Sequence, residues 1–460
     1  MRSGASYVLW VSLAMWMTAS CTPGSVTSWP ADRNSNTIVI LSGTDTSVAG
    51  GKTGIFQQLA DWWNRYMLPQ EGFTIRFDVL PGGATAEHSQ MLAAAQTGDP
   101  TTYDIYNLDN EWISEFAAGG YIRSLQGHLS TDGFLPGPLR SGQDPSGQLY
   151  AAPFTTDVGL LYYRTDLVTA AQVKRLRSYR EMLGLARQAA ARDGQKITSY
   201  VGQFAQYEGL TVNSLEAIWG HDPNAFALDG SIADRAAVAK GLADQASAFA
   251  PVGPYPAAAS TPELSYEESQ ALGEFAGGRA VFMRNWPIDY SQLLTPKISV
   301  SRHFAVNPLP FPSVLGGQDL AIAWNSANPN NALKVVQWLT SLPVERCLFA
   351  VGGFPATRGR AYDTRIWPHS SLPPNNLCGS KAGSSVDIGP VILTALRTAI
   401  PRPITPYYTE ISDLLQIEVS KFLRAKVSST DAGPAPDPGD VTGILVRALG
   451  AAATGRAPPP

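Results

Sequence analysis

Apolar positions near the start of the chain alternate between short continuous runs and helical spacing. Residues 37–41 are aliphatic after an initial threonine, which is typical of a strand buried on both faces. Residues 55–66 carry apolar side chains at helical spacing, residues 75–79 alternate as in a strand, and residues 91–95 indicate another helix. A third strand is expected at residues 103–109. This order predicts a βαβαβ unit, an open and mostly parallel sheet with helices on its faces.

The hydrophobic pattern changes at residues 150–153, which end the first unit. Residues 158–163 predict a strand that enters a second lobe, and residues 178–295 are mostly helical in pattern. Strand and turn patterns return at residues 304–311, and an amphipathic helix is expected at residues 331–342. We therefore expect the chain to cross between two α/β lobes more than once.

A chain of 460 residues is too long for a single core, and its length suggests two lobes. We assign residues 37–152 and 297–343 to lobe 1, and residues 153–296 and 344–450 to lobe 2. The proline-rich end, residues 451–460, is expected to be a disordered tail. The predicted fold is α/β, with crossover strands acting as a hinge and a ligand cleft between the lobes.

The N-terminus has the composition of an export signal. A short apolar stretch at residues 7–17 leads through small residues to Cys21, which predicts a secretory signal peptide over residues 1–20. Small residues ending on cysteine resemble a bacterial lipobox, although Thr18 stands where an aliphatic residue is usual. Lipidation at Cys21 would then tether the protein through a flexible segment, residues 21–36. The alternative is a buried N-terminal helix with an incidental cysteine.

Charge and cysteine content narrow the function further. The formal net charge is −4 and no basic block stands out, which argues against nucleic-acid binding and against electrostatic membrane binding. Membrane attachment would depend on Cys21 alone. The other two cysteines, Cys347 and Cys378, are expected to form a disulfide in an oxidising compartment. A catalytic thiol is the alternative, but neither cysteine has a nucleophile's surroundings.

Several motifs that would indicate enzymatic chemistry are incomplete. Residues 49–53 resemble the end of a P-loop, but Thr46 occupies the position of its first glycine. The chain has no G-x-S-x-G or H-E-x-x-H motif, and its five histidines are scattered. We expect neither a metal nor a cofactor. A glycoside hydrolase needs only two suitably spaced carboxylates; candidates are Asp109, Asp157, Glu208 and Asp319.

Aromatic residues beside Gly, Pro, Asn or Asp give the positive signal. An apolar ring next to polar groups suits a sugar, whose C–H faces stack while its hydroxyls form hydrogen bonds. Six aromatic residues fit this description: Trp112, Tyr207, Trp286, Phe354, Tyr407 and Tyr408. The alternative for each is ordinary core packing, which we predict for Trp62, Trp219 and Trp338.

Four ordered segments resemble bacterial extracellular solute-binding proteins of the maltose-binding-like group, which feed ABC importers. They are residues 150–167, with Tyr-Ala-Ala-Pro-Phe-Thr-Thr-Asp and Leu-Leu-Tyr-Tyr-Arg; residues 275–287; the Gly-x-x-Pro-x-x-Arg-like turn at 351–358; and Arg-Pro-Ile-Thr-Pro-Tyr-Tyr at 402–408. The likeness extends over residues 37–450. It implies a two-lobe periplasmic-binding-protein fold, a protein that binds its ligand and is not an enzyme, and a permease partner in the membrane.

Within that group the chain is most similar to actinobacterial trehalose-binding lipoproteins. The resemblance rests on residues 107–109 with Trp112, on Thr155-Thr156-Asp157, on Glu208-Gly209 and on Arg402. The subgroup tends to have Asn where this chain has Asp157. Because a carboxylate only accepts hydrogen bonds, Asp157 would select differently oriented hydroxyls or a cationic group.

The resemblance implies a set of ligand-binding residues. Trp286 and Tyr207 would stack on sugar rings, carboxylates would accept hydroxyl hydrogen bonds, and Arg402 would donate to sugar oxygens. The complete set is Asp45, Asp109, Asp157, Tyr207, Glu208, Asn285, Trp286, Gly317, Phe354, Arg402 and Tyr407. We expect a monomer that binds a disaccharide such as trehalose. The alternatives are an exported carbohydrate-active enzyme, an adhesive or scaffold lipoprotein, and the same fold binding a glycerophosphodiester or amino sugar.

Overall fold

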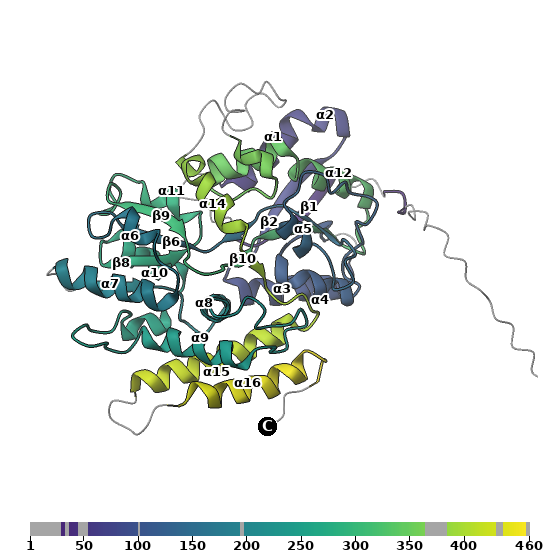
Figure 1. Ribbon diagram of the computed structural model, residues 1–460. Helices are drawn as coiled ribbons and strands as arrows, with labels where there is room; N and C mark the ends of the chain where they lie inside the picture. The colour runs from purple at the N-terminus through teal and green to yellow at the C-terminus, as the bar shows by residue number, and fades with distance from the viewer. Residues whose placement is uncertain are drawn as a thin grey trace, which may run out of the picture.

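Two α/β lobes stand side by side in the computed structural model, with a helical layer along one edge (Figure 1). The structure describes residues 29–32, 36–44, 54–99, 102–193, 197–363, 384–428 and 436–456. Within these residues the strands form three sheets, of five, four and three strands. The first two are the centres of the lobes, and the third joins them.

The first sheet has the strand order β2-β1-β3-β11-β4. β1, β2 and β3 are parallel, and β11 is antiparallel to both β3 and β4. Ile38 and Ile40 enter one hydrophobic core and Leu41 another, so β1 is buried on both faces, as its aliphatic run predicts. The strands are β1 (Thr37–Ser42), β2 (Thr74–Val79), β3 (Ile105–Asp109), β4 (Ala151–Pro153) and β11 (Gln318–Ile322).

Helices cover both faces of the first sheet. α1 buries Ile55, Leu59 and Trp63, which lie one helical turn apart and form its core-facing stripe. The elements are α1 (Ile55–Tyr66), α2 (Leu68–Glu71), α3 (Ala84–Thr97), η1 (Asn110–Trp112), α4 (Ile113–Ala118), α5 (Pro136–Ser141), α12 (Pro329–Leu339), α13 (Leu342–Cys347) and the π-helical turn η3 (Leu348–Gly352).

The second sheet has the order β7-β8-β6-β9. α8, α9, α15 and α16 pack against one another in a layer beneath it (Figure 1). The strands are β6 (Leu160–Arg164), β7 (Thr198–Val201), β8 (Ala280–Asn285) and β9 (Phe304–Pro308). The helices are α6 (Ala170–Val173), α7 (Tyr179–Asp193), α8 (Glu208–Trp219), α9 (Arg235–Ser247), η2 (Thr261–Ser265), α10 (Glu268–Ala276), α11 (Asp289–Leu293), α15 (Tyr408–Ser428) and α16 (Pro438–Ala452).

The small third sheet connects the lobes. β10 (Val314–Gly316) pairs with β5 (Asp157–Val158) and with β12 (Ile400–Pro401). Along the chain, β5 comes after β4 of the first sheet and before β6 of the second. In the same sense, β10 comes after β9 of the second sheet and before β11 of the first. The chain therefore crosses between the lobes in both directions here, as predicted. α14 (Gly389–Leu396) packs against β5 of this sheet, and η4 (Gly359–Tyr362) and η6 (Ser384–Ile388) pack against α14.

Two of the predicted lobe boundaries are wrong. β9 pairs with β6, so the beginning of residues 297–343 belongs to the second lobe. Val344, Cys347 and Leu348 pack into the core around β1, so the chain returns to the second lobe after residue 344. The strand predicted at 158–163 is two strands, because the chain changes sheets at Gly159.

The predicted tether and tail are partly structured. The Trp29 ring stacks on the His128 ring with centroids 4.2 Å apart, and Asp32 accepts a 3.0 Å hydrogen bond from the backbone of Asn330. At the other end α16 extends to Ala452, and the turn after it is hydrogen-bonded as far as Arg456. Residues 1–20, Cys21 and the last four residues lie outside the described residues.

Candidate functional site

A cavity of about 850 Å³ lies between the two lobes. The first lobe contributes the ends of β1 and β3 and the start of α3, residues 82–87. The second contributes the start of α8, residues 267–269 before and within α10, and the segment after β8. Residues 316–318 and Arg402 line the cavity where the lobes join. This is the position at which open α/β sheets bind ligands, beyond the carboxyl ends of parallel strands.

Most of the predicted site residues meet in this cavity. Eight line it: Asp109, Asp157, Tyr207, Glu208, Trp286, Gly317, Phe354 and Arg402. They come from segments far apart in the chain, and each belongs to a strand end, a helix start or a crossover. Asp45 lies outside the described residues.

Two predicted site residues do not line the cavity. Asn285 is fully buried, and its side chain supports Trp286 by accepting a 3.0 Å hydrogen bond from the Trp286 backbone. Tyr407 lies against the turn at Gly455, where a Cβ atom would come within 2.7 Å of the phenol ring. Asn285 is turned inward with the other buried residues of β8. Tyr407 precedes α15 and faces the C-terminal turn.

Trp286 is held from several sides at the cavity wall. It follows β8, its carbonyl accepts a 2.7 Å hydrogen bond from the Tyr162 hydroxyl, and its indole N–H donates to Glu268 at 3.4 Å. The Arg284 guanidinium lies over the indole ring, 3.9 Å from its centroid. Arg284 is in turn paired through two nitrogens with the buried Glu216, at 3.0 and 2.7 Å. The ring is therefore positioned before a ligand binds.

Phe354 and Gly317 shape the cavity at the crossover. The Phe354 ring stacks on Phe56 of α1 with centroids 5.4 Å apart, and both residues line the cavity. Gly317 has φ +119°, and a Cβ atom there would lie 2.3 Å from the Thr155 carbonyl oxygen. Only glycine fits this close crossing of the β10–β11 turn over residue 155.

Arg402 links the two lobes through ion pairs. Its guanidinium donates to Glu208 at 2.8 Å on the second lobe, and to Asn110 at 3.1 Å and Glu111 on the first. Glu208 also accepts hydrogen bonds from Tyr408 and, at 2.6 Å, from Ser412. The Glu208 carboxylate is thus largely occupied by the protein, and we assign it a role in positioning Arg402.

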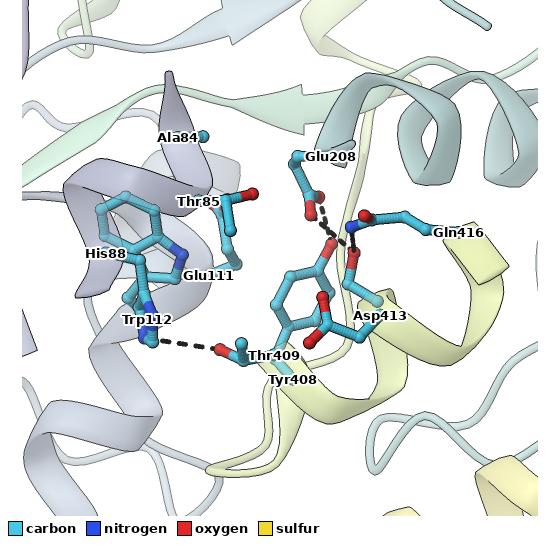
Figure 2. A pocket seen from close by; sticks show the side chains of 11 residues that line it. Ala84, Thr85, His88, Glu111, Trp112, Glu208, Tyr408, Thr409, Asp413 and Gln416 are labelled. Carbon is cyan, nitrogen blue, oxygen red and sulfur yellow. Dashed lines mark hydrogen bonds between the residues drawn. The ribbon is translucent and has the colours of Figure 1, made fainter. Parts of the chain in front are cut away.

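A second, smaller pocket of about 30 Å³ lies behind Glu208, between the lobes (Figure 2). In Figure 2 Trp112 and His88 face Tyr408 and Gln416 across it. The Thr409 hydroxyl donates to Glu115 at 3.0 Å, which joins α15 to α4. Trp112 and Tyr408, both predicted to face the ligand, line this pocket and not the larger cavity.

Several carboxylates of the large cavity are buried enough to resist ionisation. Burial raises the pKa of Asp157 to about 7, and burial with the charge of Asp109 raises the pKa of Glu87 to about 7. Burial also raises the pKa of Asp109, although its carboxylate accepts a 2.9 Å hydrogen bond from Gln318. Such shifts are typical of functional sites.

Sequence reasoning missed several cavity residues. Glu87, Glu268, Asp289 and Gln318 line it, and only the Pro81-Gly-Gly turn before α3 gave a local signal that its start approaches a ligand. Asp319, one of the candidate enzymatic carboxylates, is buried in the first sheet and does not line the cavity. Among the described residues, no group of His, Cys, Asp and Glu is arranged to hold a metal ion.

The fold and cavity define a class: two α/β lobes joined by crossing strands around a ligand-sized cleft form a two-lobe solute-binding protein. The chain belongs to the family of bacterial extracellular solute-binding proteins, which its residues 69–371 match. The family works outside the cytoplasm, which agrees with the predicted export. In the described part of the chain, no helix has the length and apolarity needed to span a bilayer.

Similar proteins agree with this class. A probable ABC transporter-binding protein of Deinococcus radiodurans is 33% identical over 299 residues, which cover 61% of this chain and 67% of the relative. The maltose-bound MalE3 of T. maritima superimposes with a TM-score of 0.73 at 24% identity, over 90% of this chain and 99% of that one. The GacH receptor of Streptomyces glaucescens, solved unliganded and with acarbose, gives 0.68 at 18% identity, over 90% and 98%.

Proposed function

We propose that this protein captures a carbohydrate of about disaccharide size and delivers it intact to an ABC permease in the membrane. Trehalose is the first candidate, because the segments around Asp109, Asp157, Glu208 and Arg402 resemble those of trehalose-binding lipoproteins. The observation that carries the proposal is the cavity of about 850 Å³ lined by Trp286, Phe354 and several carboxylates. Its size lies within the range of small-molecule sites.

The chemistry of the lining suits a polyhydroxylated ligand. Trp286 and Tyr207 offer ring surfaces for C–H groups, and Asp109 and Asp157 offer acceptors for hydroxyls. Similar solved proteins hold maltose in one case and acarbose in another. The relative from Deinococcus radiodurans supports the ABC-transporter role.

The cavity disfavours a glycerophosphodiester. Among its described lining residues Arg402 is the single cationic side chain, and it is already paired with Glu111 and Glu208. A phosphate would have to displace one of those carboxylates while facing the others, which costs Coulomb energy in a partly buried site.

Closure of the lobes around the sugar would create the surface that a permease recognises. The crossover segments at β5 and β10 are the hinge on which such a motion would turn. Lipidation at Cys21 would keep the loaded protein beside its permease. Mass spectrometry of the mature N-terminus tests the lipid directly.

Calorimetry with trehalose, maltose and sucrose tests the proposed function. We expect at least one disaccharide to bind and raise the melting temperature, and chromatography to recover that sugar intact. Hydrolysed sugar would assign the protein to the carbohydrate-active enzymes. If no sugar of a broad panel shifted the melting temperature, the adhesive or scaffold alternative would replace the proposal.

A further inference from the structure

The cavity has more carboxyl groups than cations that could pair with them. Among the described residues that line it, seven are carboxylates: Glu87, Asp109, Asp157, Glu208, Glu267, Glu268 and Asp289. Arg402 is the one cation on that wall, and its pairs with Glu111 and Glu208 neutralise it. The excess of acceptors points to a ligand rich in donors.

Three of these carboxylates gather around Trp286. The Val158 backbone donates to Asp157 at 3.1 Å, the Trp286 indole to Glu268 at 3.4 Å, and Gln292 to Asp289 at 3.2 Å. The Tyr207 hydroxyl also lies beside Glu268. No Lys or Arg of the described residues forms an ion pair with any of the three. The nearby Arg284 is held by Glu216.

The three carboxylates also repel one another. Burial raises the pKa of Asp289 well above its usual range, and the charges of Glu268 and Asp157 add to this effect. Burial is the main cause of the raised pKa of Asp157; the charge of Arg284 opposes the rise, and the charges of Asp109 and Glu268 add to it. A cation among them would relieve this repulsion and favour the ionised carboxylates.

A second observation comes from the first lobe. Asn107 at the end of β3 lines the same cavity and is 4% exposed. Its amide nitrogen donates to Ser42 at 3.0 Å, but its carbonyl oxygen has no donor among the described residues. A buried acceptor without a donor is costly, so Asn107 favours a ligand that brings an N–H or O–H group to this end of the cavity.

We propose that the ligand is an amino sugar whose protonated amine lies among Asp157, Glu268 and Asp289 beside Trp286. An ammonium group has three donors and no acceptor, which suits a wall whose carboxylates have acceptor capacity to spare. Its charge-assisted hydrogen bonds are stronger than those of a hydroxyl in the same place. The hydroxyls of the sugar serve Asn107 and Asp109. This inference rests on the proposed carbohydrate-binding function and narrows its substrate class.

Matched sugar pairs test the inference by calorimetry at pH 7. The pairs are glucose with glucosamine, cellobiose with chitobiose, and trehalose with 2-amino-2-deoxytrehalose; the N-acetyl forms serve as uncharged controls for size. We expect at least one amino form to bind tenfold or more tightly than both its neutral partner and its N-acetyl form. That preference should shrink as salt rises, because added ions screen the charge.

Isosteric variants locate the amine. Asp157→Asn, Glu268→Gln and Asp289→Asn each replace a carboxyl group by an amide of nearly the same shape, which an amine cannot ionise, and each should lower the amino-to-neutral affinity ratio by about tenfold. Asp61→Asn makes the same replacement on the exposed surface of α1 and should leave the ratio unchanged. Unfolding curves identify any variant that fails to fold, and the remaining two then decide.

Each outcome bears on the proposal. If neutral sugars bind as tightly as their amino forms, the inference is overturned and the carbohydrate-binding function stands. An amine preference that survives all three substitutions overturns the assigned position. Putrescine, measured in the same way, carries the amine without a sugar. If it binds but no sugar does, or if nothing binds, both the inference and the proposed function fail.

Discussion

Trp286 shows how single residues prepare this cavity for a ligand. The indole ring rests on Arg284, its N–H is held by Glu268, and its backbone is fixed by Asn285 and Tyr162. A ring fixed in this way loses little conformational entropy when a sugar stacks on it. Such pre-positioned aromatic residues commonly carry a large share of binding energy.

Replacing Trp286 with alanine should therefore weaken sugar binding by roughly tenfold or more while the fold is retained. Calorimetry gives the affinity, and circular dichroism gives the fold. Trp324→Ala is the matched control, because this tryptophan is 48% exposed and does not line the cavity. Equal affinities for the two variants would remove Trp286 from the site.

Asp319 is a carboxylate whose role is structural. It is buried in β11, accepts a 3.1 Å hydrogen bond from Ser141, and burial raises its pKa to about 8. Above about pH 4 the unfolded chain loses the Asp319 proton while the folded protein keeps it. The contribution of Asp319 to the free energy of unfolding is therefore fully present only below about pH 4. This contribution is lost as the pH rises toward 8.

The Asp319→Asn variant should accordingly lose less stability between pH 5 and pH 9 than the wild type. One such proton changes the free energy of unfolding by up to about 1.4 kcal/mol per pH unit. Glu263 and Glu345, whose pKa values burial also raises to about 8, leave a residual slope in the variant. Urea unfolding across this range measures the difference. Parallel curves for wild type and variant would contradict the assignment.

At the scale of elements, the junction of β10 and β11 depends on one glycine. Gly317 has φ +119°, its carbonyl accepts a 3.0 Å hydrogen bond from Asn110, and Thr155 leaves no room for a Cβ atom. We expect Gly317→Ala to destabilise the protein by at least about 1–3 kcal/mol through backbone strain and to weaken ligand binding. Gly184→Ala is the control.

The control differs from Gly317 in the two properties that matter. Gly184 lies within α7, and beyond its chain neighbours and the helix backbone no described atom lies within 4 Å of a Cβ added there. Alanine should stabilise that helix by about 0.5–1 kcal/mol. Thermal unfolding of both variants gives the comparison, and a neutral Gly317→Ala would show that the crossover can shift freely.

Local sequence patterns predict those helices and strands whose own apolar residues form a continuous segment or one face of a helix. β1 and α1 could be placed because their apolar residues are contiguous or one turn apart. β9 was assigned to the wrong lobe because its partner, β6, lies far away in sequence. No local feature distinguishes a strand that returns to its own sheet from one that crosses.

The same limit applies to the cavity residues. Trp286, Phe354 and Arg402 could be predicted because each lies in a segment with turn residues and a family resemblance. Glu268 and Asp289 could not, since an acidic residue at a helix start ordinarily faces solvent, where it favours the helix dipole. Tyr407 and Tyr408 are adjacent in sequence but face different surroundings, which only the packing of α15 decides.

At the scale of the whole molecule, one prediction concerns a disulfide between Cys347 and Cys378. Cys347 of α13 is disulfide-bonded, while Cys378 lies outside the described residues. Their pairing therefore stays a prediction from the oxidising compartment. Peptide mapping without reductant would identify the partner of Cys347.

Arg402 is the residue through which charge connects the two lobes. It contacts Glu111 and Asn110 on one side and Glu208 on the other. Glu111 is 6% exposed, and burial raises its pKa while Arg402 opposes the rise. Removal of Arg402 would leave Glu111 buried without its counter-charge.

Arg402→Met should thus destabilise the protein by about 3–5 kcal/mol, as for other buried pairs that lose one partner. The pKa of Glu111 would rise further in the variant, so the loss should grow as the pH rises and shrink as it falls. Glu111→Gln in the same chain removes the unpaired charge and should restore part of the stability. Urea unfolding at pH 5 and pH 8 measures both effects.

Small-angle scattering reports whether the lobes separate, since the ligand-free variant should have a larger radius of gyration than the wild type. An unchanged radius together with unchanged stability would mean that the hinge strands alone set the arrangement of the lobes.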